Sequence, residues 1–183
     1  MPSPTGPEIL DFRPAMRQTM LITRKSLETD GKVSRVEIEL EAGQGGPPAH
    51  IHPGQREVYT VDSGDLVVTV DGESRVITAG ESIEVTPGSV HSFANRSDEL
   101  VRFSAEHLPA LRFEEYIRLW QLRPNRRLSS RGIFERSVDG LDYDVALPPA
   151  EQFSVLECPT LVLHGADDLN VPRPTRRPGS ASE

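Results

Sequence analysis

The 183-residue chain has a single cysteine, Cys158, so it has no second thiol for an internal disulfide and cannot form a thiolate-rich zinc or iron–sulfur site. No apolar run approaches the roughly 18 residues that a membrane-spanning helix needs. The N-terminus, MPSPTGPEIL, lacks the basic start and apolar run of a secretory signal. We therefore expect no membrane partner and a cytoplasmic location.

Basic side chains are few relative to acidic ones. Lys and Arg number 20 against 28 Asp and Glu, which gives a formal net charge of −8 at pH 7. Nucleic acid and anionic membranes attract basic surfaces. The charge balance therefore argues against nucleic acid as the main partner.

Proline and glycine are plentiful, at 16 and 14 residues, which indicates short elements joined by turns. Val36, Ile38 and Leu40 alternate with acidic residues, the period of a half-buried strand. Asp71-Gly72 between two apolar runs favours a tight hairpin. About eight short strands at this spacing predict an all-β sandwich or barrel. The clearest are residues 19–29, 33–40, 66–70, 74–78, 83–85, 89–94 and 100–107.

The pattern changes after Pro109. Phe113, Ile117 and Trp120 fall at helical spacing, so we predict a helix over about 110–122 that packs on the β domain. Residues 123–150 have no clean period, and the composition of residues 171–183 is typical of disorder. We divide the chain into an N-terminal extension (1–19), a β domain (20–110), a helical or irregular extension (111–150) and a partly disordered tail (151–183).

Three of the five histidines belong to one pattern. On a strand, His50 and His52 would lie on the same face, and Glu57 can return a carboxylate to the same point after a turn. Two imidazoles and one carboxylate suit a divalent first-row metal. His91, after the Pro87-Gly88 turn, offers a third imidazole.

These residues resemble the two motifs of the cupin superfamily. The run that resembles the first motif contains His50, His52, Glu57 and Gly64. The run that resembles the second contains Gly80, Pro87, Gly88, His91 and Asn95. The resemblance covers roughly residues 20–110 and implies a double-stranded β-helix (jelly-roll) barrel. It also implies a homodimer that exchanges strands within Met20 to Leu40.

As the resemblance implies, the ligands of one divalent ion (Fe, Mn, Ni, Zn or Cu) would be His50, His52, Glu57 and His91. A barrel that keeps the fold without a metal is the alternative. Tyr59, Phe93 and His107 are expected either to line a substrate pocket or to belong to the core.

The resemblance leaves the reaction open. A redox metal would suit dioxygenase-type C–C cleavage of an enol or diketone-like substrate, with Glu57 as catalytic base. A metal that acts only as a Lewis acid would suit an isomerase or cyclase. A non-enzymatic cupin would bind a small-molecule ligand and report its presence.

A second resemblance lies in the tail. Residues 158–168, CPTLVLHGADD, are similar to the acid-bearing loop of α/β-hydrolases, which would place a triad acid at Asp168. The chain has no Gly-x-Ser-x-Gly and no His after His164, so it cannot assemble a hydrolase triad. We interpret this run as a docked strand or a remnant of a fusion.

Overall fold

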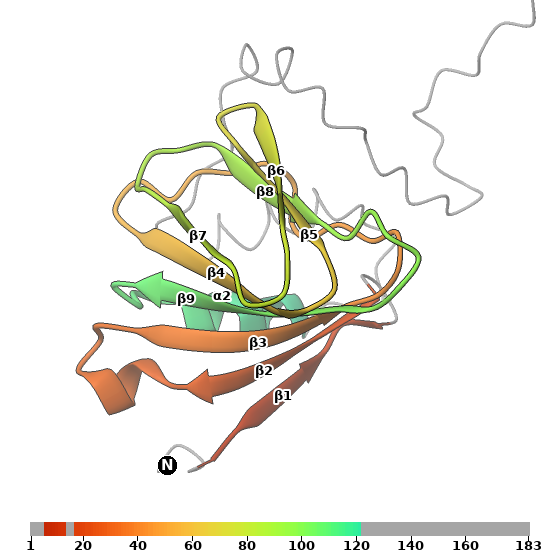
Figure 1. The fold of residues 1–183 in the computed structure, drawn as a ribbon. Coiled ribbons are helices and arrows are strands. Elements are labelled where there is room, and N and C mark those ends of the chain that lie inside the picture. The colour runs from red at the N-terminus through yellow and green to blue at the C-terminus, as the bar shows by residue number, and fades with distance from the viewer. Residues whose placement is uncertain (1–5, 14–16, 122–183) are drawn as a thin grey trace, which may run out of the picture.

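The computed structural model describes residues 6–13 and 17–121. In this part of the chain, nine strands, one 3₁₀ turn and one helix follow each other along the sequence (Figure 1). They are β1 (Glu8–Asp11), β2 (Gln18–Arg24), η1 (Ser26–Thr29), β3 (Ser34–Leu40), β4 (Arg56–Ser63), β5 (Leu66–Val70), β6 (Glu73–Ile77), β7 (Ser82–Val85), β8 (His91–Ala94), β9 (Val101–Leu108) and α2 (Phe113–Gln121).

The strands form two antiparallel sheets. The larger sheet has the order β1-β2-β3-β9-β4-β7, and the smaller one has the order β6-β5-β8. Figure 1 shows the smaller sheet as a separate layer above the larger one, with β1 at the outer edge. After β4 the chain passes to β5 and β6, returns to β7, crosses to β8 and returns to β9. This crossing between two sheets is the predicted jelly-roll architecture, and the all-β fold class is confirmed.

The alternation of inward and outward side chains along each strand determines which residues lie between the sheets. In β3, Val36, Ile38 and Leu40 are at most 3% exposed. Each such side chain contributes about 1.5–3 kcal/mol through burial. In β4 the same period buries Tyr59 and Val61, and it also places the carboxylate of Glu57 in the interior. The apolar pattern thus brings an ionisable group into the core.

Helix α2 covers one end of this interior. Phe113, Tyr116 and Ile117 are buried, as the helical spacing predicts; the side chain of Trp120 lies outside the described part. The buried carboxylate of Glu114 accepts a hydrogen bond from Ser34 Oγ at 3.1 Å. The helix begins at Phe113 and not at residue 110, because Leu111 has a positive φ of 47°.

One strand boundary in the N-terminal region differs from the prediction. The strand expected over 19–29 ends at Arg24, and Ser26–Thr29 form η1. Thr29 Oγ1 accepts from Val33 N at 2.9 Å, a local bond that favours a turn over a strand. The expected extension 1–19 contains β1, whose four residues pair with β2. The hairpin is as predicted, since Asp71 and Gly72 both have positive φ.

In the described residues, no helix is long and apolar enough to cross a membrane. The predictions for residues 122–150 and for the tail lie outside the described residues.

Candidate metal centre

Four buried side chains converge between the two sheets. One possible ligand atom from each of His50, His52, Glu57 and His91 lies within 4.8 Å of the others. The most exposed of the four side chains, His50 and His52, are 4% exposed. His50 and His52 lie in the loop between β3 and β4, Glu57 lies on the inner face of β4, and His91 is the first residue of β8. The structure thus brings together the four residues that the sequence motifs single out.

The histidine-bearing loop is attached to the β8 region by backbone hydrogen bonds. His50 N donates to His91 O at 3.0 Å, and His91 N donates to His50 O at 2.9 Å. Gly88 N donates to His52 O at 2.9 Å. The segment forms an isolated bridge and not the strand that the sequence reasoning assumed, since the prolines at 47, 48 and 53 have no N–H to donate.

Backbone carbonyls orient two of the imidazoles. His50 Nδ1 lies 2.9 Å from Pro48 O, and His91 Nδ1 lies 3.0 Å from Ser89 O. A carbonyl only accepts, so each Nδ1 carries a hydrogen, and Nε2 is the atom through which each ring can bind a metal. Burial, reinforced by the neighbouring imidazoles of His91 and His52, lowers the pKa of His50 well below its usual value. This is the state in which a histidine binds a metal.

Both oxygens of Glu57 have neighbours. Oε1 lies 3.4 Å from His52 Nε2 and 2.9 Å from His107 Nδ1. Oε2 lies 2.8 Å from His91 Nε2 and accepts a hydrogen bond from the Tyr59 hydroxyl. Burial alone would raise the pKa of Glu57, but the interactions with His107 and His52 hold that pKa well below its usual value.

The donor set therefore fits a divalent cation. An ionised carboxylate in a dry interior needs a positive partner. Next to it lie imidazoles, and those of His50 and His91 can bind a metal through Nε2 because a backbone carbonyl accepts from Nδ1. Imidazole nitrogens with one carboxylate suit Fe, Mn, Ni, Zn or Cu, and this set does not choose among them.

The cluster opens on a small apolar cavity of about 40 Å³. Tyr59, Phe93 and His107 line it, together with His50, His52 and Glu57. Sequence reasoning did not anticipate the rest of the wall, which is Met20, Val36, Ile38, Pro47, Ala105, Phe113, Tyr116 and Ile117. The residues of α2 in this list come from a different part of the chain, and no local signal near the motifs points to them.

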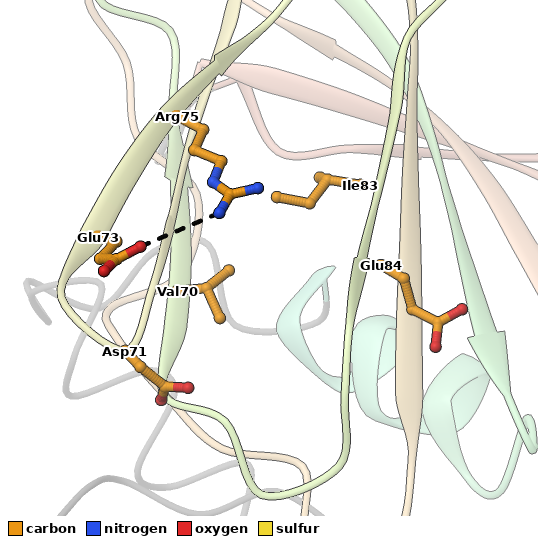
Figure 2. A pocket seen from close by; sticks show the side chains of 6 residues that line it. All are labelled: Val70, Asp71, Glu73, Arg75, Ile83 and Glu84. Carbon is orange, nitrogen blue, oxygen red and sulfur yellow. Dashed lines mark ion pairs between the residues drawn. The ribbon is translucent and has the colours of Figure 1, made fainter.

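A larger hollow of about 370 Å³ lies between the β5–β6 hairpin and β7 (Figure 2). Its lining residues are Val70, Asp71, Glu73, Arg75, Ile83 and Glu84. In Figure 2, Arg75 and Ile83 point toward each other across it, and Arg75 pairs with Glu73 at 4.0 Å. It shares no lining residue with the first cavity, and three of the four converging residues, His50, His52 and Glu57, line the smaller one.

Comparisons with known proteins agree with the fold of this chain. Residues 36–105 match the family described as Cupin domain. The HTH-type transcriptional regulator PuuR of Escherichia coli is 36% identical over 58 residues, 32% of this chain and 31% of the regulator. The probable oxidoreductase patJ of Penicillium expansum is 47% identical over 49 residues, 26% of this chain and 15% of that protein. The chain spans less than a third of the length of either relative.

Among solved structures, a predicted oxalate decarboxylase from Thermotoga maritima has a TM-score of 0.50 and 23% identity. The match covers 57% of this chain and 92% of that one, and at this identity it shows the fold alone. The family match ends at residue 105, and the resemblance of residues 158–168 to a hydrolase acid loop is not borne out.

Proposed function

We propose that this chain, which carries a cupin domain in residues 36–105, binds one divalent metal ion and acts with it on a small molecule. The proposed ligands are His50, His52, Glu57 and His91. The observation that carries the proposal is their convergence within 4.8 Å in a buried site. Their origins in one loop and two strands make this convergence a property of the fold and not of one local segment.

The proposed reaction is dioxygenase-type cleavage of a C–C bond in an enol or diketone-like substrate. A bound redox metal such as Fe(II) would supply activation of dioxygen and an anchor for the substrate oxygens. Both atoms of dioxygen would end in the two products, so no external reductant is consumed. The similarity to a probable oxidoreductase supports this class.

The chain's own residues would hold and enclose the substrate. The apolar side chains of Val36, Ile38 and Phe113 line the cavity and would contact an apolar substrate body while excluding water. Glu57 is ionised, so it is the group in this cavity that can accept a proton from an enol. Tyr59, Phe93 and His107 are the proposed pocket residues.

The test uses the full chain. Its metal content is measured by elemental mass spectrometry, and oxygen consumption is then followed after anaerobic loading with Fe(II) and addition of acetylacetone or a flavonol. We expect about one metal per chain and oxygen uptake that is absent in His91→Ala. No metal in the protein, before or after reconstitution, would contradict the proposal. Turnover without oxygen in the presence of Zn²⁺, Mn²⁺ or Ni²⁺ would instead assign an isomerase or cyclase.

Ligand binding without turnover is the second candidate, and the similarity to a transcriptional regulator favours it. Calorimetry with the same compounds distinguishes it, since saturable binding with no product under either condition would assign a sensor. A homodimer and a cytoplasmic location stay predictions. Light scattering on the purified chain tests the dimer.

A further inference from the structure

His107 is a fourth buried histidine at the site, and it is not one of the proposed ligands. It belongs to β9, where it lies directly opposite Glu57 in the register between β4 and β9. The side chain is 3% exposed, and its Nδ1 lies 2.9 Å from Glu57 Oε1. A residue outside the ligand set therefore contacts a proposed ligand from the neighbouring strand.

The protonation of the ring follows from its neighbours. His107 Nδ1 also lies 3.2 Å from Gln55 Oε1. The amide nitrogen of Gln55 donates to Pro109 O at 2.7 Å and to Ala110 O at 3.2 Å, so the amide oxygen faces His107. Both neighbours of Nδ1 accept hydrogen bonds and cannot donate. His107 Nδ1 therefore carries a hydrogen and donates it in a hydrogen bond to Glu57 Oε1.

A stacking contact also fixes the orientation of the His107 ring. His107 and Phe113 are stacked, with ring centroids 3.4 Å apart and planes 23° apart. Phe113 is the first residue of α2, and the neighbouring Glu114 accepts a hydrogen bond from Ser34 on β3. The helix that closes the cavity thus fixes the ring that donates to Glu57.

The second oxygen of Glu57 accepts from the Tyr59 hydroxyl, so each oxygen has a donor from outside the ligand set. We propose that His107 is a positioning residue that orients the Glu57 carboxylate for metal binding. This inference rests on the proposed function, because it assumes that Glu57 is a ligand. Partners that orient a metal ligand typically change metal affinity 10–100-fold when removed.

The experiment compares two substitutions that separate hydrogen bonding from packing. His107→Asn keeps an N–H near the position of Nδ1 and loses the stacked ring. His107→Phe keeps a ring on Phe113 and loses the donor. Affinity for Co²⁺ is measured by competition with a chromophoric chelator, and the visible spectrum of bound Co²⁺ is recorded. We expect about 10–100-fold weaker binding and an altered spectrum for His107→Phe, with His107→Asn much closer to the wild type.

Each result of this experiment either supports or overturns the inference. If His107→Phe binds Co²⁺ like the wild type, or if only His107→Asn is impaired, His107 has a packing role and the inference is overturned while the metal site stands. If the wild type itself does not bind Co²⁺, both the inference and the proposed function fail. Should His107→Phe not fold, judged by circular dichroism, His107→Leu takes its place, since Leu is close to His in volume and donates no hydrogen bond.

Discussion

Gly46 lies against the ring of Phe93. A methyl group at position 46 would come within 2.3 Å of the ring atoms Cε2 and Cζ, and Gly46 N donates to Phe93 O at 3.0 Å. The Phe93 ring in turn packs edge-on against Tyr59 and Phe103, with centroids 5.6 and 5.1 Å away. The missing Cβ of Gly46 therefore allows this aromatic cluster to form beside the proposed ligands.

Gly46→Ala should displace the Phe93 ring and lower the free energy of unfolding by about 1–3 kcal/mol, since an added methyl overpacks a filled core. Chemical denaturation measures this difference. Gly45→Ala is the matched control, because its Cβ would make only an ordinary contact at 3.8 Å with Phe93 O. Equal losses in the two variants would contradict the role assigned to the Gly46–Phe93 contact.

Tyr59→Phe should weaken metal binding by about 10–100-fold, because it removes the hydroxyl that donates to Glu57 and keeps the packed ring. Metal affinity is measured by chelator competition. Thr60→Val is the control, since it removes a hydroxyl from the opposite face of the same strand, where Thr60 Oγ1 pairs with Ser82 Oγ at 2.8 Å. An unchanged affinity in Tyr59→Phe would show that the hydroxyl does not support Glu57.

Removal of the metal should lower the melting temperature of the wild type. A ligand at 100 times its dissociation constant stabilises the folded state by about 2.7 kcal/mol, and a chelator abolishes this contribution. His91→Ala should lose both the metal and the response to chelator, while circular dichroism still reports β-structure. His164→Ala is the control histidine, since position 164 is outside the proposed ligand set. A wild type with the same melting temperature before and after chelation would count against the site.

Much of this site follows from short-range sequence patterns. The period of two in β4 predicts that Glu57, Tyr59 and Val61 share an inward face, and the structure buries all three. The paired motifs likewise single out His50 and His91, which the structure joins by a backbone bridge. Local patterns suffice for these residues because each lies in a short run whose spacing alone identifies it.

The rest depends on contacts between distant segments. The pairing of Glu57 with His107 depends on the register of β4 against β9, which no local pattern encodes. The contact of Phe113 with His107 depends on how α2 docks, and the helical spacing predicts only that Phe113 is buried. The prediction that His50 and His52 lie on a strand was wrong for a local reason. The prolines of this loop have no N–H to donate to the hydrogen bonds of a sheet.

The last prediction concerns the ion pair that joins α2 to the edge strand. Arg118 Nε and Nη2 donate to the two oxygens of Glu8 at 2.8 and 2.7 Å. These hydrogen bonds lower the pKa of Glu8 below its ordinary value of 4.5, so the folded state binds its proton less tightly than the unfolded state does. The pair therefore stabilises the fold above the unfolded pKa, and this contribution is lost as the pH falls through the lower, folded pKa.

Glu8→Gln should reduce the free energy of unfolding at neutral pH by at most about 1 kcal/mol, since the pair is partly exposed to solvent. The difference between wild type and variant should shrink as the pH falls below the unfolded pKa, and it should vanish below the lower, folded pKa, where Glu8 is protonated in both states. Urea unfolding at several pH values measures it, with Glu37→Gln on the exposed face of β3 as control. A difference that stays constant from neutral to acidic pH would mean that Glu8 acts through packing, because only the charge of the carboxylate makes the pair depend on pH.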